Sequence, residues 1–289
     1  MYKGRIFIRE RIYVCGNYMD ADVYPVFQPP GKRRVKCNPS SEIQTKQNQR
    51  NAEKKLTRLT HNNFGKQDLA VHLTYRNEDE PTGEEEAQKH LRNFVKRLKR
   101  RYKKAGIELK YISCTEYGKA NGRVHHHLIL TGGYDRDEIE KAWGHGYANS
   151  KRLQFGDDGI TGLAHYIAKD KHFYKRWNQS RNLDIPEAAQ FDNALNADNI
   201  KEMQEAIESK GAHKYFEELY PDFVLTDAAC SKNSINRGLY IHFDMRRCES
   251  LGRESGGSIS PGATSGRRKT SDGQTPPGRG KTTKSTKIS

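Results

Sequence analysis

Short apolar runs bounded by glycine, proline or asparagine mark the strands that the sequence predicts. Such runs favour β-structure because branched and aromatic side chains pack well on a pleated sheet. One stretch holds two runs around Gly16-Asn17 and predicts a strand pair, whereas the other stretches predict single strands. The predicted strands lie at residues 4–27, 69–75, 108–117, 123–131 and 239–245, and 147–155 predicts a short strand or a loop.

Apolar residues spaced three or four positions apart predict helices between these strands. The clearest helix follows Thr82 and Glu85, which form a capping box, and it places Leu91, Phe94 and Leu98 on one face. Further helices are predicted at residues 40–62, 135–143 and 161–177, and over most of 185–222.

The order of these elements predicts the fold class and the domains. From residue 69 a strand, a helix, a hairpin and further helices follow one another, which is the order of a split βαβ unit. We therefore expect an α+β fold with a central antiparallel sheet, flanked by helices, over residues 66–180. Residues 1–65 would add a strand pair and a helix, and residues 181–248 a mainly helical segment with a last strand. Residues 249–289 are dominated by small and basic residues and predict a disordered tail.

The chain is strongly basic. It carries 51 Lys+Arg against 36 Asp+Glu, a formal net charge of +15. This excess predicts a polyanionic partner, most simply nucleic acid, and the alternative is charge that serves solubility alone. The sequence contains no run of about 18 apolar residues, so we expect no membrane span. Five scattered cysteines without a CxxC pair predict a reducing, cytoplasmic location.

The basic residues gather on one face of the helix that follows Thr82. This face includes Arg97, Arg100 and Arg101. A face of a single charge sign predicts contacts with DNA phosphates. The alternative is a solvated helix face without a partner.

The predicted hairpin carries the candidate chemistry of the chain. Its second strand reads Val124-His-His-His-Leu-Ile-Leu130, and side chains alternate between the faces of a strand. His125 and His127 should therefore share one face, with His126 on the other. Glu116 lies on the partner strand near the turn. Two imidazoles and a carboxylate would hold a divalent metal ion and leave positions open for a substrate oxygen.

The helix predicted at 161–177 carries a second candidate group. Tyr166 and Lys169 lie three residues apart and so are neighbours on the helix surface. A tyrosine hydroxyl can attack phosphorus, and a nearby lysine can assist by lowering its pKa or by offsetting phosphate charge. Tyr174 is the reserve candidate for the nucleophile, and packing against the core is its alternative role.

These motifs resemble those of the HUH endonucleases. His125-His126-His127 before an apolar run resembles the HUH motif, and Tyr166-Ile-Ala-Lys169 resembles the YxxK motif of that superfamily. The tyrosine helix follows the histidine strand, as in rolling-circle replication initiators (Rep proteins) of bacterial plasmids and small single-stranded DNA phages. The resemblance covers roughly residues 69–177. His126 departs from it, because that position is normally apolar.

The resemblance implies a function and a set of roles. His125 and His127 would bind Mg²⁺ or Mn²⁺ with Glu116 as a third ligand, and Tyr166 would be the nucleophile assisted by Lys169. The reaction would nick and rejoin single-stranded or hairpin origin DNA, leaving a 5′-phosphotyrosine and a free 3′-hydroxyl. The sequence contains no Walker motif, so we expect a bacterial host's helicase and DNA polymerase as partners.

Two other functions remain open on the sequence alone. A transposase of the same superfamily would use the same motifs, but such enzymes are commonly shorter. A non-catalytic nucleic-acid-binding module on a split βαβ sheet would present exposed aromatic rings for base stacking. The histidines and the glutamate expected on that face would repel phosphate unless a cation lay between them, which favours the metal enzyme.

Overall fold

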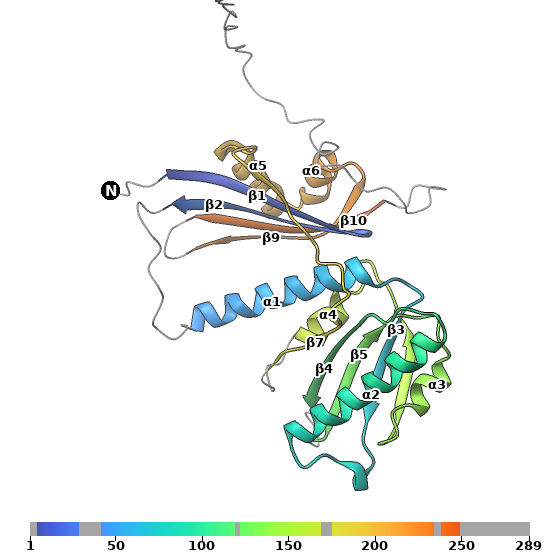
Figure 1. The fold of residues 1–289 in the computed structure, drawn as a ribbon. Coiled ribbons are helices and arrows are strands. Elements are labelled where there is room, and N and C mark those ends of the chain that lie inside the picture. Colours follow the sequence, from blue (N-terminus) through green and yellow to red (C-terminus); the bar gives the residue numbers. More distant parts are fainter. Residues whose placement is uncertain (1–4, 29–41, 119–121, 169–174, 234–237, 249–289) are drawn as a thin grey trace, which may run out of the picture. The chain divides into compact units, whose positions relative to one another are not determined.

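The computed structural model describes residues 5–28, 42–118, 122–168, 175–233 and 238–248. Residues 1–251 form one compact unit. The α+β class is confirmed, since the unit combines helices with two antiparallel sheets of five strands each (Figure 1). None of the helices in the described ranges is long and apolar enough to cross a membrane.

The first sheet, called the β3–β7 sheet, has the strand order β6-β3-β5-β4-β7. Both β3 and β4 run antiparallel to β5, which lies between them, so they are parallel to each other. Helix α2 connects β3 to β4, and this arrangement confirms the predicted split βαβ unit. The strands are β3 (Leu69–Thr74), β4 (Tyr111–Tyr117), β5 (Val124–Leu130), β6 (Ala148–Arg152) and β7 (Asn178–Gln179).

Helices cover both faces of the β3–β7 sheet. The apolar stripe of α2 (Glu84–Lys104), with Phe94 and Leu98, packs on one face against Leu73 and Leu128 (Figure 1). The other face packs against α1 (Glu42–Asn63) and α4 (Thr161–Ala168). Two shorter helical elements, η1 (Asn77–Asp79) and α3 (Arg136–Lys141), complete this half of the chain, and Asp135 caps α3 through the amide of Glu138.

The second sheet, called the β1–β10 sheet, has the order β8-β1-β2-β10-β9. It joins the predicted strand pair and the predicted last strand with two strands that the sequence did not predict, β8 and β9. Helices α5 and α6 pack on it through Phe216, whose ring lies 4.5 Å from that of Phe243. The elements are β1 (Arg5–Cys15), β2 (Tyr18–Gln28), β8 (Ala189–Asp192), α5 (Ala197–Glu208), α6 (Ala212–Leu219), β9 (Phe223–Lys232) and β10 (Leu239–Arg247).

The helix predicted at residues 161–177 is shorter than expected. Helix α4 is described from Thr161 to Ala168, and Lys175 to Trp177 are not helical. The predicted end at Trp177 is therefore wrong, because Asn178 and Gln179 already pair with β4 as strand β7. The predicted domain boundaries stay a prediction, and the tail at 249–289 lies outside the described residues.

Candidate functional site

Strand β5 presents its three histidines as its alternation predicts. His126 is fully buried at 0% exposure, whereas His125 and His127 are only partly buried on the opposite face. Antiparallel pairing sets Glu116 of β4 directly opposite His125, so their side chains share that face. The prediction that two of the histidines face Glu116 is confirmed.

Glu116 is the centre at which the predicted groups meet. Its Oε1 lies 2.7 Å from Nε2 of His125 and 3.0 Å from Nε2 of His127. The same oxygen accepts a hydrogen bond from the hydroxyl of Tyr166. Burial raises the pKa of Glu116, but these three hydrogen bonds outweigh it and hold the pKa well below its usual range. The carboxylate is therefore ionised at neutral pH.

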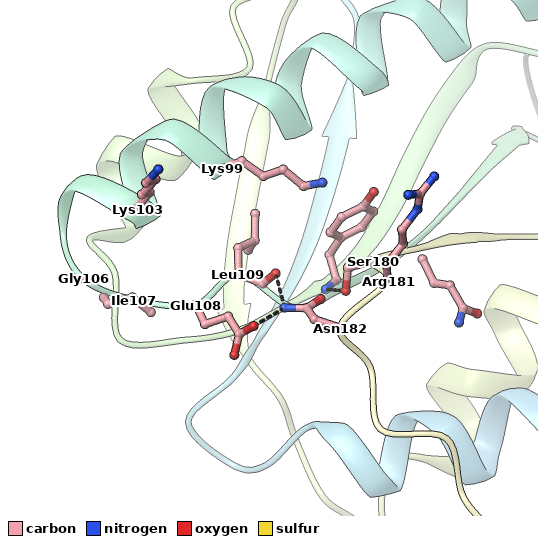
Figure 2. A pocket seen from close by; sticks show the side chains of 11 residues that line it. Lys99, Lys103, Gly106, Ile107, Glu108, Leu109, Ser180, Arg181 and Asn182 are labelled. Carbon is pink, nitrogen blue, oxygen red and sulfur yellow. Dashed lines mark hydrogen bonds between the residues drawn. The ribbon is translucent and has the colours of Figure 1, made fainter.

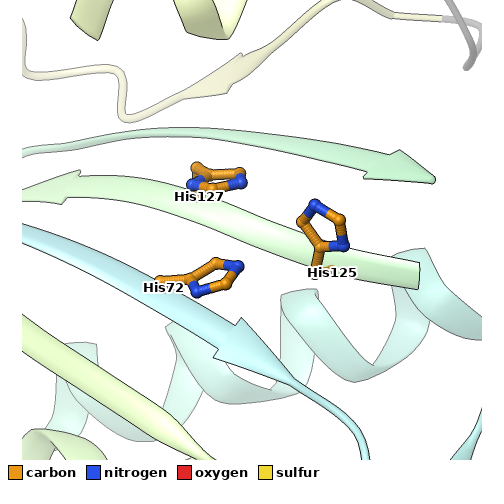
Figure 3. A group of neighbouring side chains, drawn as sticks. All are labelled: His72, His125 and His127. Carbon is orange, nitrogen blue, oxygen red and sulfur yellow. The ribbon is translucent and has the colours of Figure 1, made fainter. Parts of the chain in front are cut away.

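His72 is a site residue that the sequence did not assign. Strand β3 pairs with β5 so that His72 lies opposite His127, and their rings stack with centroids 4.5 Å apart. One nitrogen from each of His72, His125 and His127 lies within 4.8 Å of the others, as Figure 3 shows for the three rings. Alternation along the strand predicts that His72 faces away from α2, but its partner depends on the β3–β5 register, which the sequence does not reveal.

The electrostatics of this cluster suit metal binding. Burial and the two neighbouring imidazoles lower the pKa of His72 to about 4. Its ring is therefore neutral at physiological pH and keeps a lone pair for a cation. Together with the ionised Glu116, the three imidazoles make a donor set that a divalent ion fits. We call these four residues the histidine cluster.

His126 anchors the strand from the other face of the sheet. Its Nδ1 lies 2.8 Å from Oγ1 of Thr115 on β4, and its Nε2 lies 2.8 Å from the hydroxyl of Tyr75 at the end of β3. Burial lowers the pKa of His126 to about 3, so the ring stays neutral. The residue that departs from the HUH pattern thus links the three strands that carry the histidine cluster.

Tyr166 reaches the cluster from helix α4. Ala164 and Ile167 are buried and fix the helix against the sheet, while Tyr166 remains 45% exposed. Its ring lies 4.9 Å from that of His127, and its hydroxyl lies 3.5 Å from Nε2 of the same residue. The structure thus brings Tyr166 together with His125, His127 and Glu116. Lys169 and Tyr174 lie outside the described residues.

The three arginines of the basic helix face occupy different environments. Arg97 donates hydrogen bonds to the carbonyls of Ala142 and Trp143 at 2.8 and 2.9 Å. Arg101 donates to the carbonyl of Glu138 and forms an ion pair with its carboxylate at 2.7 Å. Arg100 is exposed. Two of the three guanidinium groups therefore already hold α3 against α2, and DNA contact by this face stays a prediction.

One comparison with known proteins agrees with this site. Residues 68–171 match the family model of the replication-associated protein ORF2, and this match covers less than half of the chain. The matched segment begins just before β3 and contains the histidine cluster and Tyr166. Searches of the curated proteins and of the solved structures found no match to this chain. The family match supports a replication-associated role of the Rep type for this segment.

Proposed function

We propose that this protein starts rolling-circle replication by nicking and rejoining single-stranded or hairpin origin DNA. One observation carries the proposal: the hydroxyl of Tyr166 meets the carboxylate of Glu116 beside His127, on a partly open face of the sheet. A nucleophile, a proton acceptor and a set of metal donors converge there, as phosphoryl transfer requires. The match of this segment to a replication-associated family supports the same role.

The chain's own residues account for the steps of the reaction. Tyr166 donates its hydrogen bond to Glu116, so Oε1 is in place to take the phenolic proton as the oxygen attacks. The new bond joins the tyrosine oxygen to phosphorus, the bond from phosphorus to the 3′-oxygen breaks, and that oxygen leaves with a proton from water. The products are a 5′-phosphotyrosine and a free 3′-hydroxyl, and attack by a 3′-hydroxyl on the phosphotyrosine rejoins the strand.

The histidine cluster would hold the metal ion that the reaction needs. His125, His127 and Glu116 are the predicted donors, and His72 is the donor that the β3–β5 register adds. A bound divalent ion would polarise the scissile phosphate and offset the charge that develops on it. Imidazole nitrogens suit transition metals better than Mg²⁺, which prefers oxygen ligands. We therefore expect Mn²⁺ to bind more tightly than Mg²⁺.

The proposed activity also implies partners. A nick supplies a primer end but does not unwind the duplex, so a host helicase and a host DNA polymerase would act after this protein. The basic charge of the chain, +15 in total, favours its association with the DNA strand that is cut.

Covalent capture of DNA tests the proposal. A panel of 5′-labelled single-stranded and hairpin oligonucleotides from the replicon that encodes the protein is incubated with Mn²⁺. We expect a protein–DNA adduct that resists denaturation and disappears with chelator or with Tyr166→Phe. Tyr147→Phe is the matched control, since Tyr147 is an exposed phenol (80%) outside the cluster. Binding without any adduct across the panel would favour the non-catalytic DNA-binding module.

A further inference from the structure

A groove lies at the edge of the β3–β7 sheet, away from the histidine cluster. Its volume is about 810 Å³, and it is formed by the end of α2, the connection from α2 to β4, and the residues that follow β7 (Figure 2). A backbone hydrogen bond fixes its floor, because the amide of Ser180 donates to the carbonyl of Tyr111 at 2.9 Å. The groove is thus built on the sheet rather than on a loose loop.

Three cationic side chains line this groove: Lys99, Lys103 and Arg181. Within the described part of the chain, none of the three forms an ion pair with a carboxylate. The Nζ of Lys99 lies 5.6 Å from the centre of the Tyr111 ring, which leaves its charge available to a ligand. One carboxylate, Glu108, also lines the groove and accepts a hydrogen bond from Asn182 at 2.9 Å (Figure 2). The balance is positive and favours an anionic ligand.

The groove lies too far from the histidine cluster to hold the phosphate that is cut. Tyr111 and Glu116 lie at opposite ends of β4, and a strand rises about 3.3 Å per residue, which separates them by about 17 Å. Their positions differ by an odd number of residues, so their side chains point to opposite faces of the sheet. A ligand that reaches both places must extend beyond a single nucleotide.

We propose that the groove binds the sugar–phosphate backbone of a duplex stem that flanks the nick site. This inference rests on the proposed function and adds the form of its substrate, a hairpin rather than a wholly single strand. A separation of about 17 Å corresponds to about five base-pair steps of 3.4 Å along a duplex strand. Lys99 and Lys103 lie one helical turn apart, so their charges follow one line of phosphates, and Arg181 adds a planar donor from the other wall.

The test compares the salt dependence of DNA binding between two triple variants of the full chain. The groove variant is Lys99→Gln, Lys103→Gln and Arg181→Gln. Its control is Lys66→Gln, Lys151→Gln and Arg152→Gln, which also removes two lysines and one arginine, all exposed and on the opposite side of the sheet or before β3. The probes are a fluorescent hairpin with a stem of about eight base pairs, one with about three, and a single strand, because five steps separate the two sites.

We expect the groove variant to lower the slope of log K against log[salt] by about 2 to 3 on the long stem. The short stem and the single strand should bind the groove variant and wild type alike, and the control should keep the wild-type difference between stems. Equal slopes for wild type and groove variant on the long stem would overturn the inference. An equal loss on the single strand would also overturn it, since the groove would then bind unpaired DNA.

The adduct assay separates this inference from the proposed function. The groove variant should still form the Tyr166 adduct on a single-stranded substrate, because it leaves the histidine cluster intact. If wild type forms no adduct on any substrate, the proposed function fails. The stem-dependent slope then still decides whether the groove binds duplex DNA.

Discussion

The two sheets each carry a compact cluster of acidic and histidine side chains, yet the two clusters have different partners. On the β1–β10 sheet we call Asp20, Asp22, Asp244 and His242 the aspartate cluster. By distance alone either cluster has three groups that could hold a metal ion, within 4.8 Å of one another. What differs is the source of positive charge around the carboxylates.

The aspartate cluster is neutralised by the chain itself. Arg58 of α1 donates to both carboxylate oxygens of the fully buried Asp20, at 2.6 and 2.7 Å, and Lys54 forms an ion pair with Asp22 at 2.5 Å. His242 lies 3.0 Å from Asp22 and 3.2 Å from Asp244. These cations occupy the positions that a metal ion would need, so this cluster fastens α1 to the sheet.

The histidine cluster has no such cation among the described residues. Lysine and arginine side chains in those ranges make no contact with Glu116, whose hydrogen-bond partners are two imidazoles and the Tyr166 hydroxyl. A carboxylate and three imidazoles without a fixed cation leave room for a divalent ion and a phosphate. Geometry brings candidate ligands together, and the charge around them decides whether they bind a metal or one another.

The largest expected effect separates the two clusters by activity. Glu116→Gln keeps the size of the side chain but removes its charge and its capacity to take the tyrosine proton. We expect the rate of adduct formation to fall about 10²–10⁴-fold, measured by single-turnover capture of labelled DNA. Asp22→Asn in the aspartate cluster is the comparison, and a similar loss of rate in folded Asp22→Asn protein would count against the distinction.

The next effect concerns stability. Arg58→Met would leave Asp20 buried without its cation, and we expect the free energy of unfolding in urea to fall by about 3–5 kcal/mol. Lys46→Met is the control on the same helix, since Lys46 forms only an exposed ion pair with Glu42. An unchanged midpoint for Arg58→Met would show that the aspartate cluster does not fasten α1.

A smaller effect is a pH dependence of stability that belongs to the aspartate cluster. Burial lowers the pKa of His242, but Asp22 and Asp244 outweigh it and raise the pKa to about 9, above the ordinary 6.5. The stability this residue contributes is complete below pH 6.5 and is lost as pH rises through about 9. The slope should not exceed about 1.4 kcal/mol per pH unit, the value for one proton. His242→Gln should remove this decline in urea unfolding at pH 6 to 9, and a decline that persists would assign it to another group.

The smallest effect tests the donor that the structure adds. His72→Ala should raise the Mn²⁺ concentration for half-maximal adduct formation about tenfold, a loss of about 1.4 kcal/mol in binding. His165→Ala on α4 is the control, because His165 is exposed and makes no contact with the cluster in the described structure. An unchanged Mn²⁺ dependence for His72→Ala would limit the ligands to the three that the sequence predicts.

Local patterns in the sequence predicted what depends on neighbouring residues. The alternation of β5 predicted which two histidines face Glu116, and helical spacing predicted the buried stripe of α2. The pairing of His72 with His127 and of Arg58 with Asp20 depends on contacts between segments far apart in the chain. So does the β1–β10 sheet, in which β8 pairs with β1 across most of the sequence. Local periodicity carries no information about such partners.

The most direct test of the account is a titration of the full chain with Mn²⁺, followed by the loss of the free-ion electron paramagnetic resonance signal. The account predicts that wild type and His242→Gln each bind an ion and that His127→Ala does not. Circular dichroism of each variant checks that it is folded. Binding that survives in His127→Ala, or that is lost in folded His242→Gln, would contradict the claim that the histidine cluster is the metal site.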